Sequence, residues 1–86
     1  MEKKIEFINL LNELIVNDEV DKKVLAYRIY EYIKECEFNP NKVQETKEIN
    51  GKLLKDIENF VEHKDNPAYI DNLKIQLVHF PKYIIN

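Results

Sequence analysis

The first sixteen residues carry more apolar positions than one helix face can hold. One stripe, whose members recur every three or four residues, contains Ile5, Ile8, Leu11 and Ile15. A second set, which widens this stripe round the side and could serve the core or a dimer, contains Phe7, Leu10 and Leu14. A surface helix buries a stripe little more than about 100° wide, so this helix needs neighbours on more than one side. We therefore expect residues 2–16 to form a helix that is central to the fold.

Three further helical segments follow. Residues 19–37 carry a second apolar stripe, formed by Leu25, Ile29, Tyr32 and Cys36. Residues 40–63 and 67–80 each begin with a proline behind an asparagine, and this pair suits a helix cap followed by the first helical position. Pro81 ends the last segment. The chain, residues 1–86, is predicted to be one all-α domain, a four-helix bundle with consecutive helices roughly antiparallel.

Two local features of these helices stay open at this point. Either Asp18 or Asp21 is suited to cap the second helix. Asn50-Gly51 is a frequent hairpin turn, but the flanking residues keep helical spacing, so we expect the third helix to continue through it. Gly51 then costs that helix about 1 kcal/mol relative to alanine and leaves room for a kink or a close helix crossing.

The composition indicates a small domain without covalent or metal reinforcement. The chain has 86 residues, a net charge of −3, two histidines and one cysteine, so it forms no internal disulfide. A lone thiol suits a reducing cytosol, and we see neither a signal peptide nor an apolar run long enough to span a bilayer. We expect a cytoplasmic protein. Because so small a core gives modest stability, we also expect a homodimer at micromolar concentration.

Sites for catalysis are not evident in the sequence. The carboxylate pair Glu31 and Glu35, and likewise Glu58 and Glu62, has the i, i+4 spacing of a solvated helix face. Cys36 lies on a core stripe, where a cysteine is usually a small buried hydrophobe. Metal-ligand spacing and a glycine-rich phosphate loop are both missing. The sequence therefore predicts a protein that is not an enzyme and needs no metal or cofactor.

Protein binding has positive signals. Tyr27 and Tyr30 lie off the core stripe of the second helix, close to Lys34, and tyrosine is a favoured interface anchor. The tail, residues 82–86, is too apolar to stay free in water, so it should dock on the bundle or on a partner. Its apolar members are Tyr83, Ile84 and Ile85. We predict a protein-binding module whose partner is another protein of unknown identity.

Two alternatives remain. The first is a DNA-binding regulator that uses the lysines of the third helix, which are Lys42, Lys47, Lys52 and Lys55. Acidic residues are interleaved with these lysines and the chain is weakly acidic, so nucleic-acid binding is disfavoured. The second alternative is a homodimeric structural or assembly subunit.

The pattern of the whole chain resembles the small bacteriocin immunity proteins of Gram-positive bacteria. The resemblance lies in the leucine-rich run of residues 10–14, the acidic break and charged start of residues 17–23, and the proline-led helix of residues 66–70. It implies a four-helix bundle that protects its own cell by occluding a toxin, or a similar inhibitor encoded on a mobile element. The family usually has a longer C-terminal tail that carries specificity, whereas five residues follow Pro81 here.

Overall fold

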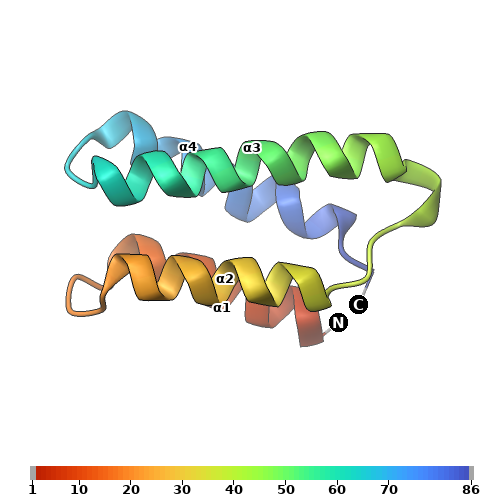
Figure 1. Cartoon of the computed structure of the whole chain (residues 1–86), viewed down its shortest axis with the longest axis horizontal. Helices are drawn as coiled ribbons and strands as arrows, with labels where there is room; N and C mark the ends of the chain where they lie inside the picture. Colours follow the sequence, from red (N-terminus) through yellow and green to blue (C-terminus); the bar gives the residue numbers. More distant parts are fainter. Residues whose placement is uncertain (1, 86) are drawn as a thin grey trace.

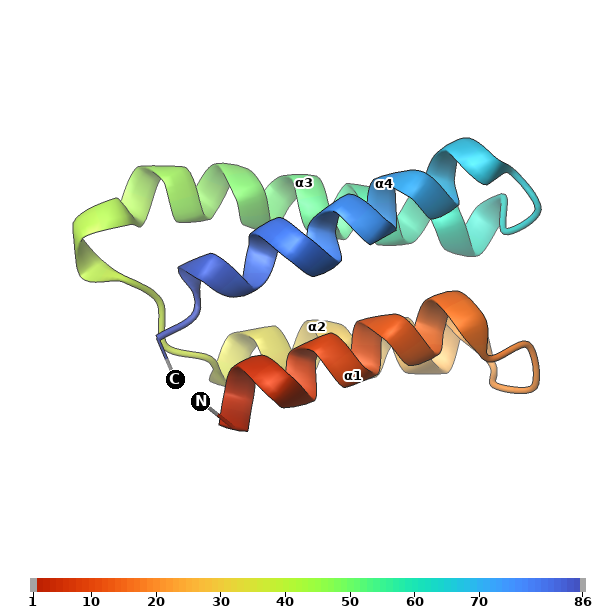
Figure 2. The ribbon, with the colours of Figure 1, turned by 180° about the vertical axis from the view of Figure 1, so that it is seen from behind.

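The computed structural model describes residues 2–85 and confirms an all-α, four-helix arrangement (Figure 1). The helices are α1 (Glu2–Val16), α2 (Lys22–Glu35), α3 (Val43–Glu62) and α4 (Pro67–His79). Two short 3-10 turns, η1 (Pro40–Lys42) and η2 (Phe80–Tyr83), precede α3 and follow α4. Consecutive helices run in opposite directions, and the two ends of the chain lie at the same end of the bundle (Figures 1 and 2).

The bundle is built from two helical hairpins. The closest pairs are α1 with α2 and α3 with α4, and the hairpins meet where α2 packs on α3 and α1 on α4. Figures 1 and 2 show the two hairpins stacked one above the other. α1 therefore has two helical neighbours, as does each other helix, and it is a corner of the bundle rather than its centre.

The core face of α1 is rotated from the predicted stripe. Phe7, Leu11 and Leu14 are fully buried, whereas Ile5 is 55% exposed and Ile8 is 38% exposed. The reason is that α2 and α4 cover only the side centred on Leu11, so the remaining apolar positions of this helix face water. Apolar periodicity predicted that this segment is a helix. It did not predict which part of the wide apolar arc the neighbouring helices cover.

The other three helices and η2 complete the core. The buried residues of α2, α3, α4 and η2 include Leu25, Ala26, Ile29, Ile33, Leu53, Ile57, Phe60, Leu73 and Phe80. Tyr32, predicted on the stripe of α2, is half-buried at the edge of this core. The rings of Phe7 and Phe80 lie 4.8 Å apart, centroid to centroid, so the last turn of the chain closes over the start of α1.

A side-chain cap sets where α2 begins. The Oδ1 atom of Asp21 accepts hydrogen bonds from the backbone N–H groups of Lys23 at 3.0 Å and Val24 at 3.2 Å. Asp21 is thus the cap, not Asp18, and α2 begins three residues later than the predicted 19–37 segment. The helix ends at Glu35 because the backbone becomes extended at Cys36.

The second asparagine–proline pair starts α4 as predicted, whereas the first caps the 3-10 turn η1, so α3 begins at Val43, three residues after Pro40, without a side-chain cap. Asn39 Oδ1 accepts from the N–H of Asn41 at 2.9 Å, and Asn66 Oδ1 accepts from the N–H of Ala68 at 3.0 Å. α3 runs without interruption through Gly51. A Cβ atom added at Gly51 would meet nothing within 4 Å, so no helix crosses closely there.

The C-terminal tail docks on the bundle. Ile84 is 1% exposed and forms an isolated antiparallel bridge with Phe38, in the connection between α2 and α3. The N–H of Ile85 donates to the carbonyl of Glu37 at 2.7 Å. The tail is therefore part of the fold up to Ile85, and Asn86, the last residue of the predicted tail, lies outside the described residues.

Candidate protein-interaction surface

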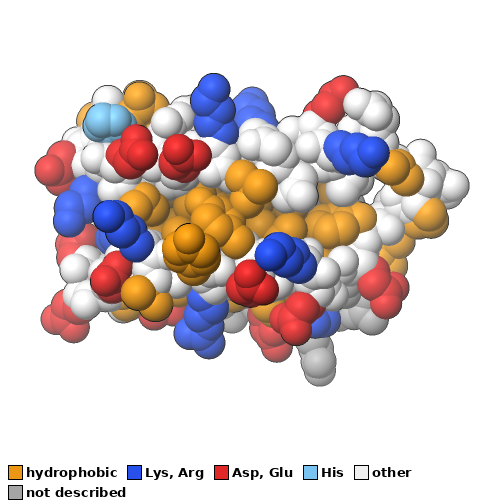
Figure 3. Space-filling view, viewed as in Figure 1, with side chains coloured by type: hydrophobic (Ala, Val, Ile, Leu, Met, Phe, Trp, Pro, Cys, Tyr) orange, Lys and Arg blue, Asp and Glu red, His pale blue; other side chains and the backbone are white. Residues whose placement is uncertain are grey.

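The seam between the two hairpins carries a shallow groove on its α2 and α3 side. We call it the α2–α3 groove, and its volume is about 430 Å³. It is lined by Tyr27, Tyr30, Glu31, Ile33, Lys34, Asn50, Leu54 and Glu58. Figure 3 shows hydrophobic side chains gathered along this seam, with charged side chains on both flanks. The groove thus has the apolar floor and polar rim typical of an interaction site.

Two tyrosines form the most prominent part of this groove. Tyr27 is 70% exposed, and its ring meets the half-buried Tyr30 edge-on, with centroids 6.0 Å apart. Burial, together with Glu58 and Tyr27, raises the pKa of Tyr30 above its usual value. The Tyr30 hydroxyl therefore stays protonated and able to donate at neutral pH. The pair presents a fixed aromatic edge with a polar tip.

An unpaired acceptor lies in the same groove. Asn50 of α3 is half-buried, and its Oδ1 atom has no hydrogen-bond partner among residues 2–85. A buried acceptor without a partner costs free energy, and because Oδ1 is closed to solvent, a donor from another molecule would recover this cost only once the amide turns toward the groove. Leu54, one helical turn further along α3, gives the groove its apolar wall. Acceptor and apolar wall together suit a ligand with both polar and apolar groups.

The rim carries charges of both signs. Lys34 Nζ lies 3.2 Å from Glu31 Oε1, and both side chains are exposed. An exposed pair of this kind contributes less than about 1 kcal/mol and exchanges partners readily. Lys34 is therefore available to a carboxylate on an incoming molecule. Tyr27, Tyr30 and Lys34, predicted from the sequence as interaction residues, thus lie together in one groove.

The predicted tail residues lie elsewhere. Ile84 belongs to the core, which corrects its assignment to an exposed surface, because its bridge to Phe38 places the side chain inside the bundle. Tyr83 is half-buried and lines a separate groove between α3 and α4. Ile85 is 49% exposed and is the one member of the three that presents a largely open apolar side chain.

The predicted core or dimer residues of α1 divide into two groups. Phe7 and Leu14 are fully buried, so they belong to the core and are closed to a second chain. Leu10 is half-buried and lines a shallow groove between α1 and α2. The apolar side chains that α1 does expose include Ile5 and Val16.

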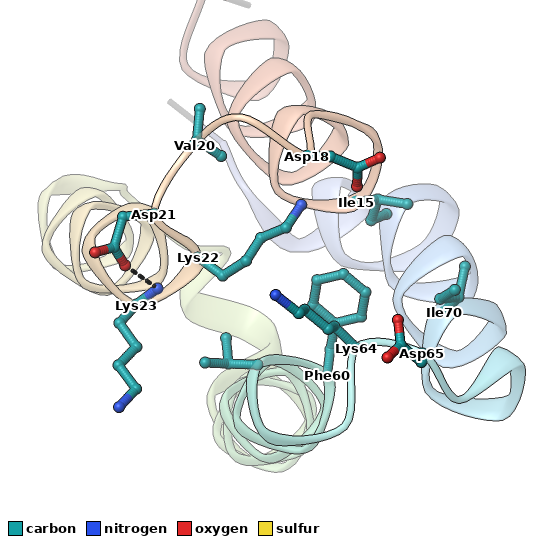
Figure 4. Close-up of a pocket in the computed structure, with 11 residues that line it drawn as sticks. Ile15, Asp18, Val20, Asp21, Lys22, Lys23, Phe60, Lys64, Asp65 and Ile70 are labelled. Atoms are coloured by element: carbon teal, nitrogen blue, oxygen red, sulfur yellow. Dashed lines mark hydrogen bonds between the residues drawn. The ribbon is translucent and has the colours of Figure 1, made fainter.

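A hollow of about 710 Å³ lies at the end of the bundle where both hairpin loops meet (Figure 4). Lys22 reaches across it, and its Nζ donates to the carbonyls of Leu14 at 2.6 Å and Asn17 at 2.8 Å. Aspartates and Lys64 surround it, so charges of both signs oppose each other. The central cation already serves the end of α1, and the hollow has a structural role.

The one cysteine of the chain is not placed to act as a nucleophile. Cys36 is buried, its Sγ donates to the carbonyl of Tyr32 at 3.4 Å, and burial raises the pKa of its thiol. Such a thiol is a poor nucleophile. Within residues 2–85, no three metal-binding side chains come together. No described helix is both long enough and apolar enough to cross a membrane.

The lysines of α3 do not form a single stripe. Lys47 and Lys52 are five residues apart and so point about 140° away from each other round the helix. Lys52 and Lys42 both line the groove between α3 and α4 that also contains Tyr83, whereas Lys47 does not line it. A helix that enters a nucleic-acid groove needs its contacts on one face, so the arrangement gives the DNA-binding alternative little support.

Sequence reasoning missed the α3 half of the groove. Leu54 follows the buried Leu53 and belongs to the same apolar arc, so spacing alone suggests a core position. Its exposure depends on the distance between α2 and α3, for which the sequence carries no signal. No family model, curated protein or solved structure matches the chain. The geometry of the surface is therefore the basis for a functional proposal.

Proposed function

We propose that this chain is a non-enzymatic protein-binding module and that its contact surface is the α2–α3 groove. The observation that carries the proposal is Tyr27, a large aromatic side chain held 70% exposed against the edge of Tyr30. Aromatic side chains left in water beside an apolar floor are favoured anchors in protein interfaces.

The groove supports a partner that offers an apolar side chain and a hydrogen-bond donor. The apolar group would cover Leu54 and the tyrosine pair, and the donor would satisfy Asn50 Oδ1. Two antiparallel helices with an apolar seam between them suit an amphipathic helix laid along that seam. The resemblance to immunity proteins supports one class of partner, a toxin whose surface the module would occlude as an inhibitor.

The test compares retention of partner proteins from the native host on immobilised wild-type chain and on single variants. Tyr27→Ala should weaken the captured complex by about 1–2 kcal/mol, or roughly five- to thirtyfold, if Tyr27 is an anchor. Tyr27→Phe keeps the ring and should retain most of the affinity. Val78→Ala, an exposed apolar change on α4 outside the groove, is the matched control.

The outcomes separate the alternatives. A complex that tolerates salt and is lost with Tyr27→Ala but kept with Val78→Ala supports the proposal. DNA binding that falls steeply with salt and depends on Lys47 and Lys52 would replace it with the regulator. Sedimentation equilibrium of the chain alone tests the homodimeric subunit, because a dimer would weigh twice the 10.4 kDa of the monomer.

A further inference from the structure

A second groove, on the other flank of α3, has a different character. It lies between α3, α4 and η2, has a volume of about 490 Å³, and we call it the α3–α4 groove. Half of its eight lining residues are basic: Lys42 from η1, Lys52 from α3, His79 from α4 and Lys82 from η2. None of the described lining residues is acidic, although the chain as a whole has a net charge of −3.

The fold brings these four side chains together from four separate elements. Docking of the tail holds η2 against the connection that leads into η1, because the N–H of Asn39 donates to the carbonyl of Tyr83 at 3.3 Å. Lys42 Nζ lies 6.0 Å from the centre of the Tyr83 ring. Lys42 and Lys82 therefore converge as a result of tertiary structure and not of spacing along one helix.

The groove also has a buried polar group with spare capacity. Gln76 lines it and is 1% exposed. Its Nε2 donates to Asp56 Oδ2 at 3.0 Å, and its Oε1 is buried and has no partner among residues 2–85. An unpaired buried carbonyl is costly, and a hydroxyl or amine donor would satisfy it. Two isoleucines and the Tyr83 ring supply apolar walls.

We propose that the α3–α4 groove binds the phosphate group of a small phosphate monoester that also carries a hydroxyl or amine donor. A phosphate monoester has nearly two negative charges and three acceptor oxygens, which suits the three lysines that line the groove from separate elements. A carboxylate has one charge and two acceptor oxygens, so it would neutralise less of the lysine charge. The donor of the ligand would pair with Gln76 once the amide moves slightly toward the groove.

The test is an NMR titration of the ¹⁵N-labelled chain with glycerol 3-phosphate at constant ionic strength. Glycerol and sodium chloride serve as ligand controls. The amides of Lys52, Gln76 and Lys82 should shift with saturation and a Kd on the order of 1 mM. Lys52→Gln should weaken binding about tenfold. Lys55→Gln, an equal charge change three residues along α3 and outside the groove, should weaken it less than about twofold.

Several results would overturn the proposal. Equal shifts with glycerol or with chloride would show that the phosphate is not recognised. Equal losses of glycerol 3-phosphate affinity in Lys52→Gln and Lys55→Gln would show a general response to charge. DNA binding that depends equally on all lysines of α3 would show the same. Lys82→Gln, a surface change in η2, gives a second variant if Lys52→Gln fails to fold.

Vesicles of phosphatidylcholine with phosphatidic acid identify the source of the phosphate. Binding of these vesicles and not of glycerol 3-phosphate, lost in Lys52→Gln and kept in Lys55→Gln, assigns the same site to a lipid headgroup. Binding of glycerol 3-phosphate alone assigns it to a free small molecule. The groove does not include Tyr27, so this test and that of the α2–α3 groove fail independently.

Discussion

Lys22 is a C-terminal cap supplied by the following helix, and its removal should destabilise the bundle. The side chain leaves the first turn of α2 and returns to the end of α1, where Nζ donates to the carbonyls of Leu14 and Asn17. It also lies 5.6 Å from the centre of the Phe60 ring. One cation therefore links the end of α1, the start of α2 and the core face of α3.

The size of the effect follows from opposing contributions. Two hydrogen bonds from a charged donor contribute about 3–6 kcal/mol before costs. Burial lowers the pKa of Lys22, with Asp18 opposing and Lys64 adding to that shift, so desolvation of the ammonium cancels part of this gain. The hollow is open enough for water to reach the freed carbonyls in a variant. We expect Lys22→Met to cost about 1–2 kcal/mol, which lowers Tm by roughly 5–15 °C.

Urea unfolding followed by far-UV circular dichroism measures this change. The midpoint should fall while the slope m stays constant, because the amount of surface exposed on unfolding is nearly unchanged. Lys23→Met is the matched control, since its side chain is exposed and should alter stability by less than about 0.5 kcal/mol. If the two variants unfold at the same urea concentration, Lys22 is not a cap that matters to stability.

Two further predictions concern single side chains. Gly51→Ala should stabilise the fold by about 0.5–1 kcal/mol in the same urea assay, because the position is helical and open; an unchanged or lower midpoint would contradict this. Burial, then the nearby Glu6 carboxylate and further negative charges, raises the pKa of Tyr32, whose hydroxyl donates to the carbonyl of Lys3, above that of the unfolded chain, near 10. The folded state therefore holds this proton more tightly, so stability is complete below about pH 10 and falls as pH rises above it. Tyr32→Phe should flatten that fall in unfolding measurements at a series of alkaline pH values, and an equally steep fall would exclude Tyr32 as its cause.

Local chemistry made the start of the last helix predictable. The side chain of Asn66 and the ring of Pro67 act within three residues, so the start of α4 is encoded in a few positions. The rotation of α1 was not predictable in this way. Its apolar arc is wider than two neighbours can cover, and the choice of Phe7 over Ile8 depends on the Phe80 ring, more than seventy positions away.

The candidate site likewise has one part that could be predicted from the sequence and one part that could not. Tyr27 was identifiable because its angle on α2 follows from the stripe through Leu25 and Ile29. Leu54 and Asn50 were not identifiable as its neighbours, because that requires the pairing of α2 with α3. The basic α3–α4 groove was harder still to predict, because Lys82 and Lys42 line the same groove only once the tail has folded back on the bundle.

The hairpin architecture supports the proposed binding at the α2–α3 groove. Packing within each hairpin is closer than packing between them, so the seam is where this small domain leaves apolar surface in reach of a partner. A molecule that spans the seam contacts Tyr30 on one hairpin and Leu54 on the other. Such a molecule would bind the assembled bundle and not the separated hairpins, so its binding free energy would add to the stability of the fold. On this reasoning, a partner that binds at the seam would also cover apolar surface that the core leaves open.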